Sequence, residues 1–359
     1  MGEYGKFISE KRRSVPTPKS IVNKDGVCEF GTFDKEFVHL NLVDAKKPTR
    51  LPQCFNKKKL TLWEATEIHF DNGVLLCVVC DMGIFGLNLN VFYDKRTQKA
   101  YKWQTNLPSK KTVIAPNLVG GSVAEAKHKN GFIRYVNNLD EGKCALCGVH
   151  KNKEGQTLQY DLNLTRVSKP SVVSIPFGKN RPLYSQKDFF KAEGKITFNG
   201  EDFLCTENST AIIDDHRGYY PRKMHFDWVT TLGRTLNGEQ KYFAFNLTRN
   251  QSISQEDYNE NLIWLEGKTS LLPPVVFERD NPTKKFKKDD TWRVKDAHDM
   301  VNLTFTVKDI FEMEVHAMVV KIEYYITFGE LSGYLRDEDG NKISLDGLMG
   351  MGEDKTMLF

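Results

Sequence analysis

The chain contains 359 residues, of which 40% are hydrophobic and 27% are charged, and its formal net charge is +4. This composition is typical of a globular protein and excludes a disordered or fibrous chain. Basic residues gather only in short runs at Lys11–Arg13, Lys57–Lys59 and Lys284–Lys288, so no basic stripe predicts a nucleic-acid partner.

Seven cysteines are present, an odd number in a long chain. The sequence MGEYGKFISEKRR at the start contains no apolar run of the kind that forms a secretory signal. No stretch approaches the roughly 20 apolar residues of a membrane-spanning helix. We therefore expect reduced thiols, a cytoplasmic location and no membrane span.

Residues 1–27 are polar and contain two prolines, and we expect them to form an extended N-terminal arm. From Cys28 onward, short runs rich in β-branched and aromatic residues alternate with turn signals such as Asp71-Asn72-Gly73 and Asn199-Gly200. Long stretches with helical periodicity are scarce, and Ser185–Gly194 is the best candidate for a helical turn.

Towards the end of the sequence, polar and apolar residues alternate as they do in strands. Between Lys321 and Phe328, the even-numbered residues are Ile, Tyr, Ile and Phe, and the odd-numbered ones are Lys, Glu, Tyr and Thr. Many antiparallel strands joined by turns are typical of β-barrels and β-sandwiches. The sequence therefore predicts a mostly β protein.

The length of the chain predicts two domains, at roughly 100–200 residues each. The proline-containing stretch SKPSVVSIPFGKNRPLYSQ lacks hairpin signals and suits a crossing between them. We therefore expect a first β domain over residues 28–185 and a second over residues 186–359.

The most unusual segment is DDHRGYYPRKMHFDW, Asp214 to Trp228, in which charged and aromatic residues are concentrated. A glycine and a proline in its first half predict a turn. Its second half predicts a strand, on which His225 and Asp227 point to one face and the apolar residues beside them point to the other.

Three interpretations of this segment stay open. If the strand is covered on both faces, His225 and Asp227 are buried and must be paired, and desolvation would shift their pKa values as in acid–base sites. The segment could instead line a ligand site, where Arg and Tyr side chains bind a polar head group. The simplest interpretation is a structural network of Asp–Arg and His–Asp pairs.

Two Cys-x2-Cys pairs resemble parts of a zinc site. Cys144 and Cys147 precede His150, whereas Cys77 and Cys80 lie in the apolar run LLCVVCD, which predicts a strand. Residues three apart on a strand face opposite ways and do not easily bind one metal. We therefore expect buried thiols and predict neither a metal nor a cofactor.

Four blocks of the sequence resemble the DUF2804 family of uncharacterised proteins. The blocks are GTFDKEFVHLNLVDA at Gly31–Ala45, DDHRGYYPRKMHFDWV at Asp214–Val229, ENLIWLEGKTSLLPP at Glu260–Pro274 and FGELSGYLRDEDGNKISLDGLMGMGED at Phe328–Asp354. The second block is the most specific. The family is similar in fold to two-domain lipocalin-like proteins such as the carotenoid hydratases and the AttH-like proteins. The resemblance implies two tandem lipocalin-like antiparallel β-barrels or sandwiches packed side by side.

Fold likeness does not transfer function, and no catalytic residue is carried over from the family. The first hypothesis is that a lipid or another apolar small molecule binds in a barrel or an inter-domain pocket. Its polar contacts would come from Arg217, Tyr219, Tyr220, Arg222, His225 and Trp228.

The second hypothesis is a cofactor-free hydratase, isomerase or cyclase acting on a hydrophobic unsaturated substrate. Its acid–base residues would be Asp215, His216, His225 and Asp227, with Glu64 and Glu323 as weaker candidates for the acid. The third hypothesis is a structural or interaction protein without a ligand. The oligomeric state stays open.

Overall fold

The computed structural model describes residues 2–236, 238–281, 286–317 and 320–358, and strands form most of the described chain. The chain divides into two compact units. Unit 1 contains Met1–Arg13, Gln98–Ala100 and Pro221–Phe359, and unit 2 contains Ser14–Thr97 and Tyr101–Tyr220. Each unit is built on its own antiparallel sheet, so the expected mostly β fold of two tandem barrel-like sheets is confirmed.

The sheet of unit 2 joins fourteen strands of the described chain. They are β1 (Gly31–Phe33), β2 (Thr61–Phe70), β3 (Gly73–Asp81), β4 (Phe85–Asp94), β5 (Lys99–Pro108), β6 (Thr112–Val113), β7 (Ser122–His128), β8 (Gly131–Asn138), β9 (Lys143–Lys151), β10 (Thr157–Arg166), β11 (Ser171–Pro176), β12 (Pro182–Phe198), β13 (Glu201–Leu204) and β14 (Thr210–Gly218). The main path runs β5-β4-β3-β2-β14-β12-β10-β9-β8-β7-β6. The late strand β14 is therefore inserted between β2 and β12.

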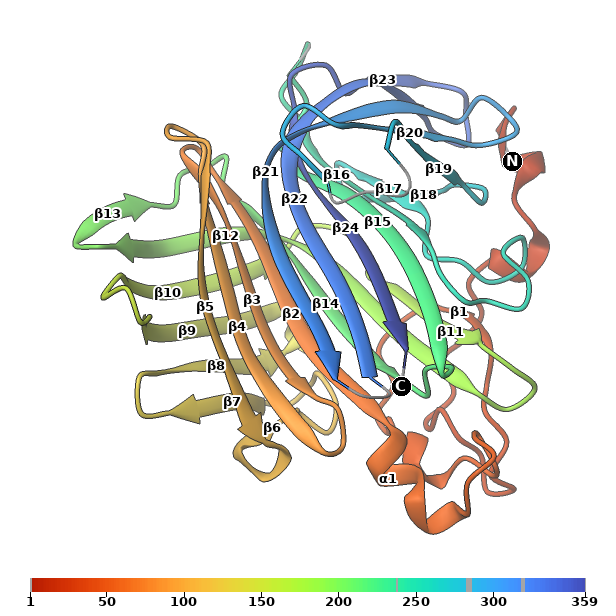
Figure 1. Cartoon of the computed structure of the whole chain (residues 1–359). Helices are drawn as coiled ribbons and strands as arrows, with labels where there is room; N and C mark the ends of the chain where they lie inside the picture. Colours follow the sequence, from red (N-terminus) through yellow and green to blue (C-terminus); the bar gives the residue numbers. More distant parts are fainter. Residues whose placement is uncertain (1, 237, 282–285, 318–319, 359) are drawn as a thin grey trace. The chain divides into compact units, whose positions relative to one another are not determined.

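This sheet curls into a nearly closed barrel, because groups from its two ends meet inside. The hydroxyl of Tyr135 in β8 donates to the carbonyl of Cys77 in β3 (2.9 Å). Asn88 Nδ2 in β4 donates to the carbonyl of Ala126 in β7 (3.1 Å). In Figure 1, β2 to β5 cross in front of β7 to β10.

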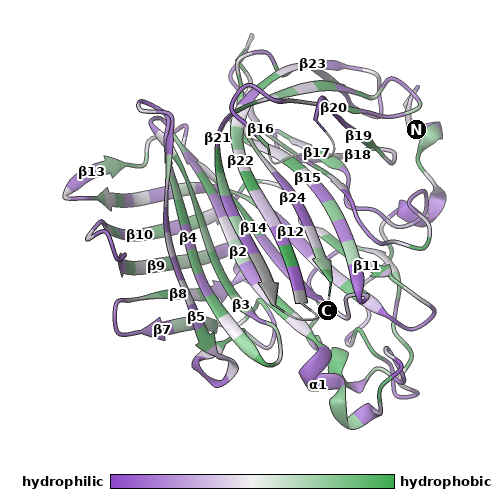
Figure 2. Cartoon of the chain, in the orientation of Figure 1, coloured by the Kyte–Doolittle hydropathy of each residue, from purple (hydrophilic) through white to green (hydrophobic). Residues whose placement is uncertain are grey.

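The inside of the barrel is apolar towards one end and polar towards the other. Phe, Leu, Ile and Ala side chains and Trp103 form the apolar cluster. Further along the same inward faces, Glu64, Asp215 and Gln186 are consecutive cross-strand neighbours on β2, β14 and β12, and all three are fully buried. Hydrophilic residues accordingly interrupt the hydrophobic ones along these strands (Figure 2).

The sheet of unit 1 joins ten strands of the described chain and forms a half-barrel. They are β15 (Lys223–Arg234), β16 (Tyr242–Arg249), β17 (Leu262–Leu265), β18 (Lys268–Leu271), β19 (Val276–Arg279), β20 (Thr291–Lys295), β21 (Val301–Ala317), β22 (Val320–Arg336), β23 (Lys342–Ser344) and β24 (Met349–Leu358). The main path runs β18-β17-β16-β15-β24-β22-β21-β20-β19. The last strand, β24, therefore lies between β15 and β22, and the core around Trp292 and Phe305 covers one face.

Two long strands curl at glycines that no other residue could replace without strain. Gly194 in β12 has a φ of +125°, and a Cβ there would lie 2.1 Å from the carbonyl oxygen of Asp161. Gly333 in β22 has a φ of +96°, and its Cβ would lie 2.3 Å from the carbonyl oxygen of Asn302. Glycine inside a strand marks such a bend or close backbone approach.

The helices are short. They are the 3-10 turns Gly5–Phe7, Glu10–Arg12, Leu42–Asp44, Gln53–Phe55, Ser109–Lys111 and Leu139–Glu141, and the single α-helical turn α1 (Asn56–Lys59). Among the helices of the described residues, none has the length and apolar character needed to cross a membrane.

The expected helical turn at Ser185–Gly194 is wrong, because this stretch forms the middle of β12. β11, β14 and β10 pair with it, and most of its residues are buried on both faces, so strand pairing overrides the local helical pattern. The expected domain boundary between residues 185 and 186 also lies inside β12. The two units divide instead between Tyr220 and Pro221.

The expected arm over residues 1–27 divides between the units, and its first part is packed into unit 1. Arg12 is buried, and its Nη1 and Nη2 donate to the carbonyls of Leu272 and Asn261 (3.0 Å each). Burial lowers the pKa of Arg12 to about 9, which leaves it charged at neutral pH. A buried cation whose hydrogen bonds end on backbone carbonyls fixes the arm to its unit.

We expect Arg12→Met to lower the free energy of unfolding by about 2–3 kcal/mol, because charge-assisted hydrogen bonds are lost and two buried carbonyls lose a donor. Urea denaturation of the full chain measures the change. Lys11→Met is the control, since the Lys11 side chain is 63% exposed in its ion pair with Asp257. Equal effects of the two substitutions would contradict the anchoring role of Arg12.

Candidate functional site

The segment Asp214–Trp228 supplies two strands that belong to different units. Asp214–Gly218 is the end of β14 and not the expected turn, because it pairs with β2 on one side and β12 on the other. The next four residues link β14 to β15, and Lys223–Trp228 begins β15. The segment therefore contributes to two sites, one in each unit.

The site in unit 2 lies inside the barrel around Glu64. Glu64 Oε1 accepts a hydrogen bond from Asn137 Nδ2 (2.7 Å), which reaches across from β8. Its Oε2 has no hydrogen-bond partner among the described residues. Burial, followed by the charge of Asp215, raises the pKa of Glu64 to about 8. At neutral pH, Glu64 is therefore mostly a neutral carboxylic acid with a proton to donate.

Asp215 faces Glu64 across the ladder between β14 and β2 and forms an ion pair on its own strand. Arg217 Nε and Nη2 donate to the two carboxylate oxygens of Asp215 (2.7 and 2.8 Å), in the bidentate geometry typical of strong pairs. Burial opposes the charge of Arg217, but Asp215 outweighs it and raises the pKa of the guanidinium. The carboxylate of Asp215, held by Arg217, thus lies beside the neutral carboxylic acid of Glu64.

A second polar group continues from this pair along β12. Tyr184 donates its hydroxyl proton to Gln186 Oε1 (2.6 Å), and Gln186 Nε2 donates to Asp188 Oδ2 (2.7 Å). Arg166 Nη2 contacts Asp188 Oδ1 at 2.6 Å and also pairs with Glu36. Burial raises the pKa of Asp188 to about 6, although Arg166 opposes the rise.

The segment Gly31–Ala45, here called the cover segment, packs over this polar end of the barrel. The ring of Phe37 is 1% exposed and lies 5.9 Å from the ring of Tyr184. Glu36 belongs to the same segment. Tyr219, expected to bind ligand, is fully buried and donates its hydroxyl proton to the carbonyl of Leu42 (3.0 Å). Tyr219 therefore anchors the cover segment.

His216 lies in β14 and points to the opposite face of the sheet from Asp215 and its cross-strand neighbour Glu64. Its Nε2 is 3.3 Å from Asp214 Oδ1, and Lys187 Nζ is 2.5 Å from the same oxygen. The ring of Trp63 lies 4.9 Å from the His216 ring and 5.5 Å from that of Tyr220. The sheet therefore separates His216 from Asp215, two residues that we expected to act together.

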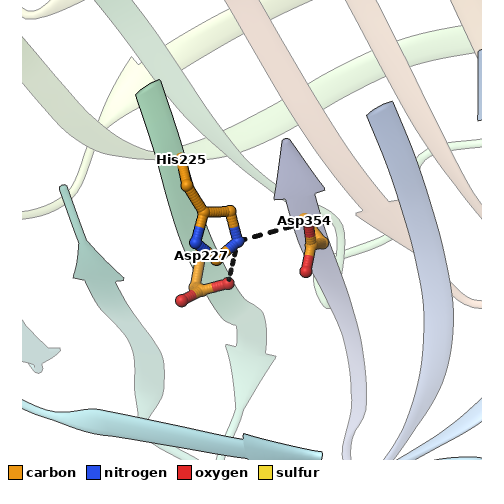
Figure 3. Close-up of side chains that lie close together, drawn as sticks. All are labelled: His225, Asp227 and Asp354. Carbon is orange, nitrogen blue, oxygen red and sulfur yellow. Dashed lines mark ion pairs between the residues drawn. The ribbon is translucent and has the colours of Figure 1, made fainter. Parts of the chain in front are cut away.

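The site in unit 1 joins His225 and Asp227 of β15 to Asp354 of β24 (Figure 3). His225 Nε2 lies 3.1 Å from Asp227 Oδ1 and 3.3 Å from Asp354 Oδ1. Asp227 and Asp354 are direct cross-strand partners. Arg279, at the end of β19, pairs with Asp227 and reaches Asp354 Oδ2 at 3.1 Å.

These four side chains balance one another's charge. Hydrogen bonds that the imidazole donates to Asp227 and Asp354 raise the pKa of His225 to about 9, so its imidazole is protonated at neutral pH. Burial acts to raise the pKa of Asp227, but His225 and Arg279 outweigh it and leave the pKa below its ordinary value. The Arg279 guanidinium also lies 4.5 Å from the centre of the Trp292 ring. This arrangement matches the structural-network interpretation of the segment.

His225, Asp227 and Asp354 also form a donor set that metal ions bind. Their ligand atoms lie within 4.8 Å of one another, and an imidazole with two carboxylates suits several divalent ions. Arg279 already contacts both carboxylates, so a metal ion there would stand beside a permanent cation. The residues therefore fit a salt-bridged network better than a metal centre.

We expect His225→Gln to lower the free energy of unfolding by about 1 kcal/mol at pH 6 and to have no effect at pH 10. The pKa of His225 is higher in the folded protein than in the unfolded chain. Its contribution is therefore full below pH 6.5 and is lost as the pH rises through about 9. The side chain is 46% exposed, and solvent screening keeps the effect small.

Urea denaturation at the two pH values checks this expectation, with His39→Gln as an exposed control that should show no pH-dependent change. A loss of equal size at pH 6 and pH 10 would show that packing, not charge, explains the effect of His225→Gln.

The remaining expected site residues lie apart from both clusters. Trp228 is on the opposite face of β15 from Asp227 and donates from Nε1 to Asn246 Oδ1 (2.6 Å). Arg222 is exposed in the link between β14 and β15. Glu323 forms an ion pair with Lys321 (2.8 Å).

Strand β9 turns Cys144 inward and Cys147 outward, so the two thiols do not share a face. Cys144 Sγ lies 3.3 Å from Asn137 Oδ1, beside the Glu64 site. The seven cysteines are free thiols.

Sequence reasoning named Glu64, Asp215, His225 and Asp227 but missed the partners that come from distant strands. These partners are Glu36, Asn137, Arg166, Gln186, Asp188, Arg279 and Asp354. The available signal was a polar residue at an inward position of an otherwise apolar strand, as for Asp188 before Phe189 and Phe190. Which of these residues become neighbours depends on the order of the strands in the sheet, and this order cannot be read from the sequence.

A family profile described as "Domain of unknown function (DUF2804)" matches residues 12–359. No curated protein matches the sequence. Among solved structures, kievitone hydratase from Nectria haematococca is similar at 11% identity with a TM-score of 0.48, over 83% of this chain and 88% of that one. CghA is similar at 9% identity with a TM-score of 0.38, over 98% of this chain and 96% of that one, and a crystal structure of CghA with Sch210972 gives a TM-score of 0.39. At this level of similarity, neither the roles of individual residues nor an activity can be transferred to this chain.

Proposed function

The chain belongs to the DUF2804 family, and we propose that it is a cofactor-free acid–base enzyme whose reaction takes place inside the barrel of unit 2. The observation that carries the proposal is Glu64, a buried carboxyl with one oxygen bound to Asn137 and the other without a hydrogen-bond partner among the described residues. Perturbed carboxyl groups of this kind cluster at functional sites.

Glu64 is suited to act as a general acid at neutral pH. It donates its proton to an unsaturated carbon of the substrate, and its pKa near 8 lies close to the working pH of a cell. In an isomerisation or cyclisation, the resulting carboxylate removes a proton from another position of the same substrate. In a hydration, the added water returns a proton to it. Either sequence restores the neutral acid without a redox partner.

The neighbours of Glu64 support this cycle. The Asn137 amide stabilises the carboxylate that forms when the proton leaves. The negative charge of Asp215 favours the return of a proton, and Arg217 limits the repulsion by pairing with Asp215. An acid that gives up its proton and regains it readily is the kind that catalyses reversible proton transfer.

Binding of a lipid without conversion receives less support from this geometry. An acyl chain needs an apolar lining, whereas the inward positions around Glu64 carry ion pairs and amides. A purely structural network is also less favourable, because a buried neutral acid with an unpartnered oxygen costs stability. Such a cost is tolerated where the group has a function.

Entry of a substrate requires the cover segment to move. Glu36 and Phe37 lie over Arg166 and Tyr184 at the polar end, so their displacement exposes the region next to Glu64. Segments that close over a site and exclude water are common in enzymes of this kind.

Solvent deuterium provides a test that does not need the substrate in advance. The full chain is incubated in D2O with a small-molecule extract of its source cells, and mass spectrometry searches for compounds that gain deuterium. The carboxyl proton of Glu64 exchanges with solvent, so its transfer to carbon labels the product. We expect labelled products with the wild type, none above background with Glu64→Gln, and full labelling with Glu67→Gln, a buried carboxyl on the opposite face of β2.

Labelling that persists in Glu64→Gln would rule out Glu64 as the acid. A compound that copurifies with the protein and never gains deuterium would favour binding without conversion. The absence of any labelled compound with the wild type in extracts from several growth conditions would count against an enzyme.

A further inference from the structure

A pocket of about 350 Å³ in unit 2 lies away from the Glu64 site, where the two ends of the curled sheet approach each other. Its walls are β4 and β5, the turn after β7, and the end of β9 with the turn that follows. Side chains bridge these elements: Asn152 Nδ2 donates to the carbonyl of Lys102 (3.2 Å), and Trp103 Nε1 donates to that of Gln156 (3.0 Å). The volume is within the range of small-molecule sites.

The floor of the pocket is formed by buried polar side chains that carry no charge. Asn88, Trp103 and His150 are each no more than 3% exposed. Tyr160 donates its hydroxyl proton to Asn90 Oδ1 (2.9 Å), so its oxygen accepts from His150 Nε2 (3.2 Å). This bonding places the imidazole proton on Nε2 and leaves Nδ1 to face Asn90 Nδ2 (3.4 Å). Burial lowers the pKa of His150 to about 3, so the floor carries no charge.

The rim of the pocket carries the charge. The charged side chains of the lining are those of Lys102, Lys151, Lys153 and Glu154, which gives 3 − 1 = +2. Burial lowers the pKa of His128, so this imidazole adds no charge at neutral pH.

Amide side chains complete the lining. They are Asn88, Gln104, Asn106, Asn130 and Asn152. A primary amide donates and accepts hydrogen bonds at the same time, which matches a hydroxyl group, and a lysine ammonium suits phosphate or carboxylate as a point charge.

From this combination we propose that the pocket binds a small hydroxylated anion, the class that includes sugar phosphates. The amides of Asn106 and Asn130 contact the hydroxyl groups over the neutral floor, and the lysines at the rim contact the phosphate. The site is independent of Glu64 and of the proposed acid–base reaction, because none of its lining residues belongs to the network around Glu64.

Isothermal titration calorimetry with glucose 6-phosphate tests the proposal on the full chain. We expect a dissociation constant below about 1 mM at low salt, and binding at least about tenfold weaker for glucose alone and for inorganic phosphate alone. We also expect Lys151→Met with Lys153→Met to weaken binding by about tenfold or more, since two phosphate contacts are lost. Lys143→Met, on the same strand β9 but outside the pocket, and Glu64→Gln should bind as the wild type does.

Absence of binding to the wild type at about 10 mM glucose 6-phosphate would overturn the proposal. Two further results would do the same: inorganic phosphate binding as tightly as the sugar phosphate, or the double lysine variant binding as tightly as the wild type. Thermal melting of each variant confirms that it is folded before its affinity is compared.

Discussion

Replacing Glu64 with Gln is expected to make the protein about 4 kcal/mol more stable at pH 8 and to leave its stability unchanged at pH 4. The pKa of Glu64 is about 8 in the folded protein and 4.5 in its ordinary state. Between these values the folded protein retains a proton that the unfolded chain releases, so stability falls by about 1.4 kcal/mol for each pH unit. Gln keeps the shape and the hydrogen bond of the neutral acid but never ionises.

Urea denaturation of the full chain at pH 4, 6 and 8 measures this difference, and hydrogen exchange of the β2 amides assigns it to unit 2. Glu67→Gln is the matched control: Glu67 is also buried on β2, but it is paired with His69 at 2.6 Å. Loss of this partner should not stabilise the protein. A Glu64→Gln variant less stable than the wild type at pH 8 would show that Glu64 is ionised and paired in the folded state.

Removing Arg217 is expected to have the opposite effect, a loss of about 3–5 kcal/mol for Arg217→Met at pH 7. The cause is not the lost attraction alone. The substitution leaves the carboxylate of Asp215 buried without its bidentate partner and beside Glu64. The double variant Asp215→Asn with Arg217→Met should recover a large part of the loss, because no unpaired charge then stays buried.

A double-mutant cycle by urea denaturation tests this coupling. The exposed pair of Lys195 and Asp202 (3.0 Å) in the same unit is the control, and its removal should fall within the error of the measurement. Additive losses at Asp215 and Arg217 would mean that the two residues do not act as a pair.

Much of the fold follows from local pattern. The alternation between Lys321 and Phe328 predicted a strand, and it lies in β22. The pattern failed at Ser185–Gly194, where most residues are buried on both faces and the alternation of polar and apolar residues is lost. The boundary between the two units could not be predicted either. β14 and β15 belong to different units, but only four residues separate them, too few to show a linker in the sequence.

The candidate sites could also be predicted only in part, because their properties depend on residues from distant strands. Glu64 was a weak candidate in the sequence because a carboxyl group in an alternating strand is normally exposed. Its pKa is raised first by burial inside the barrel and then by the charge of Asp215, about 150 residues away, and its hydrogen bond depends on Asn137 across the barrel. His225 and Asp227 were placed together correctly by strand periodicity. Arg279, which decides that their cluster is charge-balanced, lies on a strand that no local signal connects to β15.

The anchoring of Arg12 in unit 1 has a consequence for how the protein is made. Arg12 and Arg13 are synthesised well before their partners Asn261, Leu272 and Glu338. At about 5–20 residues per second, they wait roughly 15–65 seconds for those partners to be synthesised, while unit 2 emerges whole in the interval. During translation, Arg12 and Arg13 therefore stay undocked until most of unit 1 has been synthesised.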